Sequence, residues 1–561
     1  MKLTLVHTPA IMAVDNYSTI TQPPLGIAYL AAYAKQLGHD VHVVDAVGEA
    51  VKSIRPWPHW KKRLIQGLSF EEVIARIPRD SDVIGVSCMF THAWPMVREL
   101  MLLMKREFPQ AKLIAGGEHV TAMYDTVLRQ VPVDLCVMGE GEVTLGDVLD
   151  AFQKGDADYA KINGVSFIDT QGQIVKTPRR QRVMDPDVLP WPAWELLDPM
   201  AYVDNEVYMG PVPVAGRSMP MLASRGCPFE CTFCSSPNMW TPVWKARHPA
   251  KVVDEMEFYV NRYQANDFQF QDLTAIVRKD WIIAFCKELI ARRLNVTWQL
   301  PVGTRTEAID AEVTEYLVQS GCHHITYAPE SGSDRIRKAV KKKVRLDRLE
   351  TSVQASLKSG MRVCLFNIIG LPQEEPEDIK KTFRWLRRMA RIGVHEITVS
   401  TFVPLPGTEL FDEASKIKPI VADDEYCHWM TGSTSLLAVR SWNPRFSDRR
   451  LRFLKLWLFL QFYAVSFFYY PDRLWRLVRN GILKIQETKA DRVIREFIIK
   501  IPIVLGFSSQ PWDVERRRAR GRDAAVPIHR QQGPHRGREL YPPQTLEIIP
   551  FEKLSDTRLT E

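Results

Sequence analysis

The sequence predicts an α/β protein in which two parallel-sheet domains are followed by a helical region. Residues 1–150 alternate short apolar strands with helical patterns, which is typical of a Rossmann-like, doubly wound sheet. Residues 216–415 repeat six strand–helix units, which predicts a partial (β/α)6 barrel of the TIM type. A connector over 151–215 joins the two domains, and a helical region over 416–510 follows the second. Residues 511–561 form a basic tail that we expect to be disordered.

The first domain is assigned from short apolar strands that are separated by longer helical repeats. The expected strands are 2–6, 42–44, 83–87, 112–115 and 135–138, and the expected helices are 27–37 and 94–108. Three loops fall at the carboxyl ends of these strands, and they contain Ser87, Gly116 with Gly117, and Gly139 with Glu140. Glycine lets a backbone approach a ligand closely, and doubly wound sheets bind their ligands at this edge. We therefore expect a ligand beside these loops.

The connector contains two recognisable features. Residues 162–168 and 174–177 flank the turn Thr170-Gln-Gly and predict a β-hairpin. The stretch from Pro186 to Trp194 holds three prolines, so it can form neither a helix nor a central strand. We expect this stretch to brace one domain against the other.

The second domain repeats the strand–helix pattern with longer helices. The expected strands are 220–223, 267–271, 297–300, 324–327, 362–369 and 396–402. The expected helices include 249–263, 279–292, 310–321, 346–359 and 377–392. Active sites of such barrels lie on the loops that follow the strands. The chemistry of this domain is therefore expected on those loops.

A triplet of cysteines, Cys227, Cys231 and Cys234, follows the first of these strands with the spacing C-x3-C-x2-C. Three thiolates within eight residues can hold a [4Fe–4S] cube and leave one iron open to a small molecule. A zinc site needs four ligands, and no second C-x2-C lies in the chain. Nine cysteines in 561 residues are too sparse for a disulfide framework, and the other six are expected to be core residues.

The other loops at the barrel mouth carry further candidates. Asp272 ends the second strand, and Arg305 follows the third, where it can clamp a carboxylate or form a bracing salt bridge. Glu330, Ser331 and Gly332 follow the fourth strand. Ile369 and Gly370, within Asn367-Ile-Ile-Gly-Leu-Pro372, follow the fifth, and Pro404-Leu-Pro-Gly-Thr408 follows the sixth.

Cysteine spacing, domain order and loop motifs together resemble the radical S-adenosylmethionine (SAM) enzymes that carry a cobalamin-binding domain. The resemblance implies a [4Fe–4S] cluster on the three cysteines, with SAM on the open iron. It implies SAM contacts from Asp272, Glu330, Ser331, Gly332, Ile369 and Gly370, and a path for the cobalamin nucleotide tail along Ser87, Gly116, Gly117, Gly139 and Glu140. Two positions depart from the pattern: no D-x-H-x-x-G motif follows the first strand, and Gln271 replaces the first acid of a carboxylate pair.

The layout is similar to that of class B methyltransferases and of the anaerobic magnesium-protoporphyrin monomethyl ester cyclase. This resemblance implies that a 5′-deoxyadenosyl radical activates a substrate, which then takes a methyl group from cobalamin. Our main hypothesis is methylation of an unactivated carbon in a secondary metabolite, lipid or pigment precursor. The alternatives are a radical cyclisation or rearrangement without net methyl transfer, and a non-catalytic cobalamin sensor or scaffold. An electron donor such as flavodoxin or ferredoxin would serve the cluster.

The C-terminal region bears on partners and location. Residues 456–470 lack charge, and a basic aromatic stretch follows them, so 451–507 can contact a membrane surface peripherally or pack under the barrel. The net charge of +8 is concentrated at the end, where residues 515–538 hold eight arginines and two acids. We expect a solvated tail and no nucleic-acid partner. Sparse cysteines and the absence of a cleavable signal predict a cytoplasmic protein, peripheral to the inner membrane face if the membrane contact forms.

Overall fold

The computed structural model describes residues 1–14, 21–58, 60, 62–156, 158–205, 207, 216–433, 435–483, 488 and 491. The prediction for the basic tail, and most of the predicted membrane-contacting stretch beyond residue 483, lie outside these residues.

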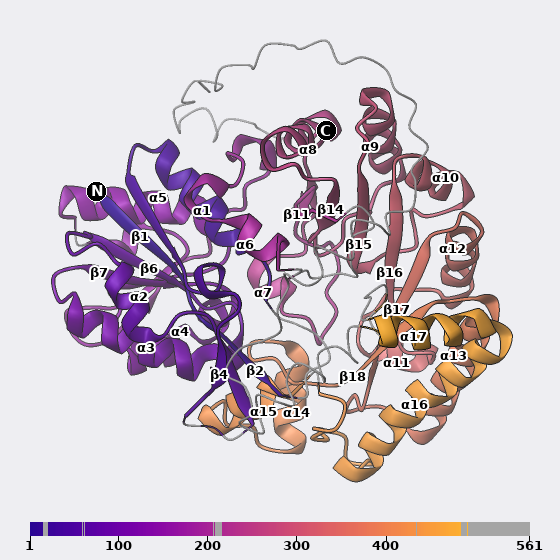
Figure 1. Ribbon diagram of the computed structural model, residues 1–561. Coiled ribbons are helices and arrows are strands. Elements are labelled where there is room, and N and C mark those ends of the chain that lie inside the picture. The colour runs from indigo at the N-terminus through magenta and orange to yellow at the C-terminus, as the bar shows by residue number, and fades with distance from the viewer. Residues whose placement is uncertain are drawn as a thin grey trace, which may run out of the picture. The chain divides into compact units, whose positions relative to one another are not determined.

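The first domain is built on a seven-stranded sheet with the order β10-β9-β8-β7-β6-β1-β3 (Figure 1). Its parallel strands are β1 Lys2–His7, β3 Asp40–Asp45, β6 Val83–Ser87, β7 Lys112–Gly116 and β8 Leu135–Val137. Its helices are α1 Leu25–Gln36, α2 Phe70–Arg76, α3 Trp94–Glu107, α4 Glu118–Gln130 and α5 Gly141–Lys154. The predicted doubly wound sheet is therefore confirmed.

The two faces of this sheet are covered by different helices. Helices α1 and α5 pack together over one face, and α2, α3 and α4 pack over the other. The chain passes from β1 to β3 on one side and then to β6, β7 and β8 on the other. The strand order therefore reverses between β1 and β6, which is where ligands bind in doubly wound sheets.

A small antiparallel sheet with the order β2-β5-β4 is an addition that the sequence pattern did not predict. It consists of β2 Ala10–Ala13, β4 Ile54–Pro56 and β5 Arg63–Gln66. These strands are three or four residues long, which is too short for a clear alternation of apolar and polar side chains.

The connector contains the predicted hairpin, β9 Val165–Ile168 and β10 Ile174–Lys176, and the short helix α6 Pro199–Val203. The hairpin extends the first sheet, because β9 pairs antiparallel with β8. The proline-rich stretch braces both domains as expected. Ala193 N donates to Ala28 O of α1 at 3.0 Å, and Trp194 Nε1 donates to the hydroxyl of Tyr259, in the second domain, at 3.0 Å.

The second domain is a six-stranded parallel sheet whose strands follow chain order, from β11 at one edge to β18 at the other. Its strands are β11 Ser218–Met221, β14 Asp267–Phe270, β15 Thr297–Thr304, β16 Cys322–Glu330, β17 Arg362–Ile369 and β18 Glu396–Thr401. Its helices are α7 Ser236–Trp240, α8 Pro249–Tyr263, α9 Lys279–Arg292, α10 Ala311–Gln319, α11 Asp334–Ala339, α12 Leu346–Lys358 and α13 Pro376–Ile392. Two-residue strands β12 Ser224–Arg225 and β13 Lys245–Ala246 form a separate ladder. The partial (β/α)6 barrel is thus confirmed.

The C-terminal helices are α14 Glu409–Ile417, α15 Asp424–Thr431, α16 Asp448–Tyr469 and α17 Pro471–Leu483. Helix α16 is the one helix in the described part of the chain that is long and apolar enough to cross a membrane, with a mean hydropathy of 1.3. It packs along α13 and β18, and 33% of its apolar window is buried (Figure 1). Packing against the barrel therefore accounts for one face of α16.

Candidate functional site

The three cysteines lie on the loop that follows β11 and β12. Gly226 precedes this loop with φ +83°, and a Cβ there would come 2.1 Å from Val243 O. Only glycine fits such a left-handed, crowded position. Within the loop, Cys234 N donates to Cys231 O at 3.0 Å, which forms a tight turn. The backbone therefore holds three thiols on one short, tightly turned loop.

The thiols are largely buried beside two cations. Burial raises the pKa of Cys234 to about 12, and the nearby Cys231 and Cys227 add to this effect. Burial also raises the pKa of Cys227 and Cys231, while Lys342 and Arg305 oppose this rise. A metal would therefore have to displace protons from these sulfurs as it binds.

No three Cys, His, Asp or Glu side chains in the described part of the chain converge closely enough to hold a single metal ion. A zinc ion would need ligands within about 2.3 Å of one point. An iron–sulfur cube has its irons at separate corners, so its thiolates need not meet at a point. The donor set of three thiols on one loop fits a cube with one open iron and does not fit a zinc site.

Asp272 lies under the cysteine loop rather than open to a ligand. Its carboxylate accepts hydrogen bonds from Ala223 N, at 3.2 Å, and from the Ser224 hydroxyl. Burial raises the pKa of Asp272 to about 6, although the hydrogen bond from Ser224 opposes the rise. This geometry makes Asp272 a brace for the strand that leads into the cysteines.

Glu330 ends β16 in a strained conformation, with φ +65° for a non-glycine residue. Its carboxylate accepts a hydrogen bond from Lys342 Nζ at 2.9 Å, and both side chains are buried. Burial opposes the charge on Lys342, but Glu330 and Cys231 together raise the pKa of Lys342. Non-glycine residues in this conformation occur mainly where a site demands them, so the strain supports a role for Glu330 at the mouth.

The neighbouring motif residues are packed against helices. Ser331 Oγ lies 3.3 Å from Thr382 Oγ1, and Gly332 N donates to the same oxygen at 3.0 Å. Ile369 is fully buried at the end of β17. Gly370 N donates to Glu374 Oε2 at 2.6 Å, and a Cβ on Gly370 would lie 2.6 Å from Leu451 of α16. These residues fix the shape of the mouth, and the structure brings them to the same barrel end as the cysteines.

A cavity of about 150 Å³ opens at the carboxyl edge of the first sheet. All five residues predicted to lie along the nucleotide tail line it: Ser87, Gly116, Gly117, Gly139 and Glu140. The rest of the wall is mainly apolar and includes Leu5, Ile27, Leu30, Ile114, Val137 and Leu145. A Cβ on Gly116 would meet nothing closer than 3.7 Å, so the missing side chain at this position leaves the cavity open.

Helix α7, which begins two residues after Cys234, forms part of the same cavity wall. Met239 and Trp240 of α7 line the cavity. Met239 Sδ lies 3.6 Å from Thr121 Oγ1 of α4, and that hydroxyl accepts a hydrogen bond from Gly139 N at 3.0 Å. The cysteine loop and the cavity are therefore adjacent along the chain as well as in space.

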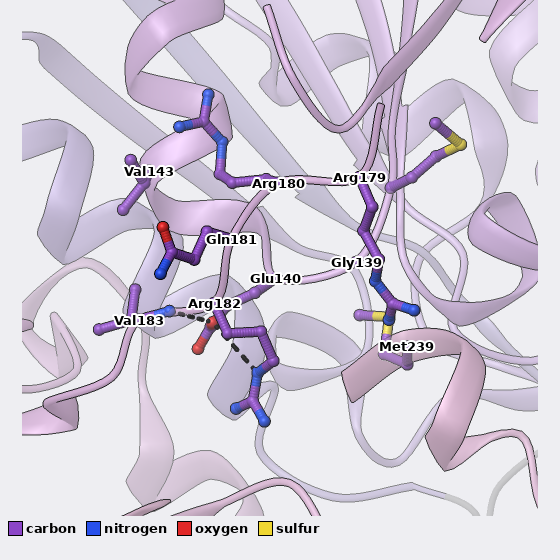
Figure 2. A pocket seen from close by; sticks show the side chains of 10 residues that line it. Gly139, Glu140, Val143, Arg179, Arg180, Gln181, Arg182, Val183 and Met239 are labelled. Carbon is purple, nitrogen blue, oxygen red and sulfur yellow. Dashed lines mark hydrogen bonds and ion pairs between the residues drawn. The ribbon is translucent and has the colours of Figure 1, made fainter. Parts of the chain in front are cut away.

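A buried cluster of charges joins the two domains beside this wall. Arg225 donates to Glu140 Oε1 at 2.9 Å and to Glu142 Oε1 at 2.7 Å, and all three side chains are buried. Figure 2 shows Glu140 directed towards Arg182 and the backbone of Val183, whose N–H donates to Glu140 Oε2 at 3.0 Å. The hollow drawn there has about 10 Å³ of free space, which is room for about one water molecule. It is part of the interdomain packing and is too small for a cofactor.

Sequence reasoning missed three residues of the site, Arg225, Lys342 and Glu118. Arg225 gave a signal, since it stands two residues before Cys227, but its partners lie 83 and 85 residues away. Lys342 is one of three consecutive lysines, a pattern that is typical of a solvated surface. Buried Glu118, from the first domain, affects the pKa of Cys234, and burial raises its own pKa. Arg305, which was predicted from the sequence, stacks at 3.6 Å on Phe229 in the cysteine loop and pairs with Glu307, which favours the bracing salt bridge.

Two family descriptions match the chain. Residues 15–149 match the B12 binding domain, and residues 221–386 match the radical SAM superfamily. These ranges contain the cavity-lining loops and the cysteine loop, respectively.

Several curated proteins are similar over most of the chain. An uncharacterized methyltransferase of Pyrococcus horikoshii is 27% identical over 74% of this chain and 83% of its own length. The cytidylyl-2-hydroxyethylphosphonate methyltransferase of Streptomyces wedmorensis is 25% identical over 74% of this chain and 82% of its own length. The anaerobic magnesium-protoporphyrin IX monomethyl ester cyclase of Rubrivivax gelatinosus is 28% identical over 70% of this chain and 66% of its own length.

Two solved structures share the fold. The radical SAM methyltransferase TsrM of Kitasatospora setae, with cobalamin and a [4Fe–4S] cluster bound, has a TM-score of 0.56 at 18% identity. That alignment covers 74% of this chain and 78% of TsrM. The cobalamin-dependent radical SAM enzyme OxsB, with aqua-cobalamin bound, has a TM-score of 0.62 at 14% identity and covers 93% of this chain and 81% of OxsB.

Gly226 provides a test of the cysteine-loop geometry. We expect Gly226→Ala to lose most of its iron after anaerobic reconstitution, because the added methyl group would collide with Val243 O. The left-handed φ alone would cost about 1–2 kcal/mol. Gly38→Ala is the matched control, since Gly38 has φ +85° with no atom within 4 Å of a Cβ. Iron and sulfide analysis of the two proteins decides, and equal iron contents would show that the loop tolerates a side chain there.

Proposed function

The chain joins a B12-binding domain to a radical SAM domain and is therefore a cobalamin-binding radical SAM enzyme; on that premise we propose that it methylates an unactivated carbon. The observation that carries the proposal is the shared wall: α7 leads from Cys234 into the cavity lined by Ser87, Gly116 and Gly139. A radical generator and a methyl carrier must serve one substrate, and this arrangement sets their two sites side by side.

Three cofactors are implied: a [4Fe–4S] cluster, SAM and cobalamin. We assign the cluster to Cys227, Cys231 and Cys234, and the cobalamin tail to the cavity of the first sheet. When bound, these groups supply a 5′-deoxyadenosyl radical and a transferable methyl group, and the protein orients them. Glu330 is our candidate for a polar SAM contact, since its carboxylate lies near enough to Cys231 to raise the pKa of that thiol, and its backbone is strained.

The remaining motif residues act mainly by holding the mouth rigid. Asp272 fixes the strand before the cysteines, and Glu374 fixes the loop at Gly370. The buried pair of Arg225 and Glu140 links the cysteine loop to the cavity edge. A rigid mouth of this kind keeps the reacting groups aligned. This orientation is the contribution of the protein to catalysis.

Methyl transfer is favoured over the alternatives by the extent of the similarity. The two methyltransferases match over more than four fifths of their own lengths, whereas the cyclase matches over 66%. The substrate class is a small molecule or lipid, as in a secondary metabolite or pigment precursor. A cobalamin sensor without catalysis would not need three cysteines on a specialised loop, so their presence supports an enzyme.

The reaction itself is tested by following the methyl group of SAM. We expect the reconstituted protein, with reductant and a candidate substrate, to form 5′-deoxyadenosine and a product that gains the isotope of the labelled SAM methyl group. Mass spectrometry of the reaction mixture measures the 5′-deoxyadenosine and the isotope content of the product. 5′-Deoxyadenosine with an unlabelled product would instead establish cyclisation or rearrangement. Cys234→Ala should remove both signals, and no 5′-deoxyadenosine from the loaded wild-type protein would favour the sensor.

Cobalamin binding is tested by filling the cavity. Gly116→Leu should weaken cobalamin binding at least tenfold, because a side chain there would occupy the space beside Val137 without backbone strain. Gly116→Ala is the matched control and should bind as the wild type does, since its Cβ has ordinary contacts at 3.7 Å. Spectroscopic titration with hydroxocobalamin compares them. Unchanged binding by the leucine variant would place the tail elsewhere.

We also propose cytoplasmic location with peripheral membrane contact through the outer face of α16 and α17. Arg473 anchors α17 to the barrel through Gly393 O, at 2.7 Å, and Val394 O, at 2.9 Å. The opposite side presents apolar side chains, with Phe468 81% and Trp475 72% exposed. Aromatic residues beside arginines are typical of helices that lie in a membrane interface.

Liposome flotation tests this contact. The double variant Phe468→Ser/Trp475→Ser should float several-fold less than the wild type with vesicles of phosphatidylglycerol and phosphatidylethanolamine. Val421→Ser, at an exposed apolar residue in the loop between α14 and α15, should float as the wild type does. Equal flotation of all three proteins would exclude a membrane contact through this face.

A further inference from the structure

The chain from Asp334 to Arg348 carries eight basic residues and two acidic ones. We call residues 334–348 the cationic segment; it comprises α11 and the loop that leads into α12. Six of its basic side chains are exposed: Arg335, Lys338, Lys341, Lys343, Arg345 and Arg348. A hollow of about 390 Å³ lies over the segment, and four of these side chains line it: Lys338, Lys343, Arg345 and Arg348. The proposed methyl transfer gives no role to the positive charge of this surface.

The cationic segment directly contacts the cysteine loop. Lys341 O lies 4.0 Å from Cys231 Sγ, and Thr232 N donates to Val340 O at 3.2 Å. Arg305, which stacks on Phe229 of the cysteine loop, donates to Lys343 O. The side chain of Lys341 is nevertheless 51% exposed. The wall between a cysteine sulfur and solvent is therefore one residue thick at this point.

Only part of the surface charge is neutralised within the protein. Lys341 pairs with Glu409 at 2.7 Å, Arg345 with Asp347, and Arg335 with Asp378. In the part of the chain that the structure describes, Lys338, Lys343 and Arg348 have no carboxylate within ion-pair distance. Three cations thus remain to attract an anionic partner to this side of the cysteine loop.

We propose that the cationic segment is the docking surface for a small acidic one-electron carrier protein. The inference rests on the proposed function, because a cluster that cleaves SAM must receive one electron in each cycle. The carrier gives up one electron, the cluster gains it, and no bond forms or breaks. Charge complementarity steers such partners and raises their association rates, while the thin wall keeps the donor close to the acceptor.

The surface fits an acidic protein better than a nucleic acid. Proteins that bind single strands combine positive charge with aromatic side chains on which bases stack. The cationic segment contains no aromatic residue between Asp334 and Arg348. Its charges instead belong to a segment that contacts Cys231 through Lys341 O, which suits the docking site of an electron donor.

Charge reversal tests the proposal on the full-length, reconstituted protein. Lys338→Glu/Lys343→Glu should weaken binding of a bacterial flavodoxin on the order of tenfold at low ionic strength. It should slow cluster reduction by flavodoxin hydroquinone, followed as bleaching of cluster absorbance, to a similar extent. Reduction by dithionite, which needs no docking surface, should keep the wild-type rate.

Lys52→Glu/Lys358→Glu is the matched control, because it makes the same change of net charge at lysines outside the cationic segment. Equal weakening in the two variants, or unchanged flavodoxin binding in the first, would overturn the proposal. So would binding of a single-stranded oligonucleotide that is tighter than that of flavodoxin and is lost in the same variant. Bleaching by dithionite shows that the cluster is present. If dithionite bleached no cluster absorbance, that result would reject the proposed function and not the docking surface.

Discussion

A single buried guanidinium connects the two halves of this protein. Arg225 stands at the end of β12, two residues before the first cysteine, and its charge is neutralised by Glu140 and Glu142 at the start of α5. Removing one partner from a buried pair of this kind costs about 3–5 kcal/mol, because it leaves a charge without water or counter-ion. The carboxylates cannot move far, since they begin a helix whose buried residues, such as Leu145 and Leu149, pack in the core. The cysteine loop is consequently positioned by the first domain as well as by the barrel.

The same principle recurs around the mouth, where polar side chains under the loops hold the backbone in place. Ser224, Gly332 and Gly370 are each fixed by a hydrogen bond to a buried side chain, namely Asp272, Thr382 and Glu374. Such bonds are strong in a low-dielectric interior and fix the conformation of the loop backbones. Several residues that motifs mark as ligand contacts therefore act in this structure as supports for their neighbours.

The strands and the cavity were predictable because their signals are local. Alternating apolar runs marked β1, β6 and β17, and glycines at strand ends marked the loops at Gly116 and Gly139. The charged links were not predictable, because Arg225 and its partners are more than eighty residues apart and nothing in either segment indicates the pairing. Lys342 illustrates the same limit: within a run of lysines it looks solvated, yet it is buried against Glu330. Local sequence patterns identify the helices and strands, whereas tertiary packing determines which polar side chains contact one another.

Helix α7 has a consequence for how such an enzyme can diversify. The segment from Cys234 to Trp240 belongs to the cysteine loop at one end and to the cavity wall at the other. The distance from Cys234 to this part of the cavity wall is thus limited by a covalent segment of seven residues, Cys234 to Trp240. Mutations elsewhere around the mouth can change the shape of the substrate pocket while the length of this segment stays constant. Enzymes that keep this segment could therefore evolve new substrates while the distance from the cysteine loop to this cavity wall stays the same.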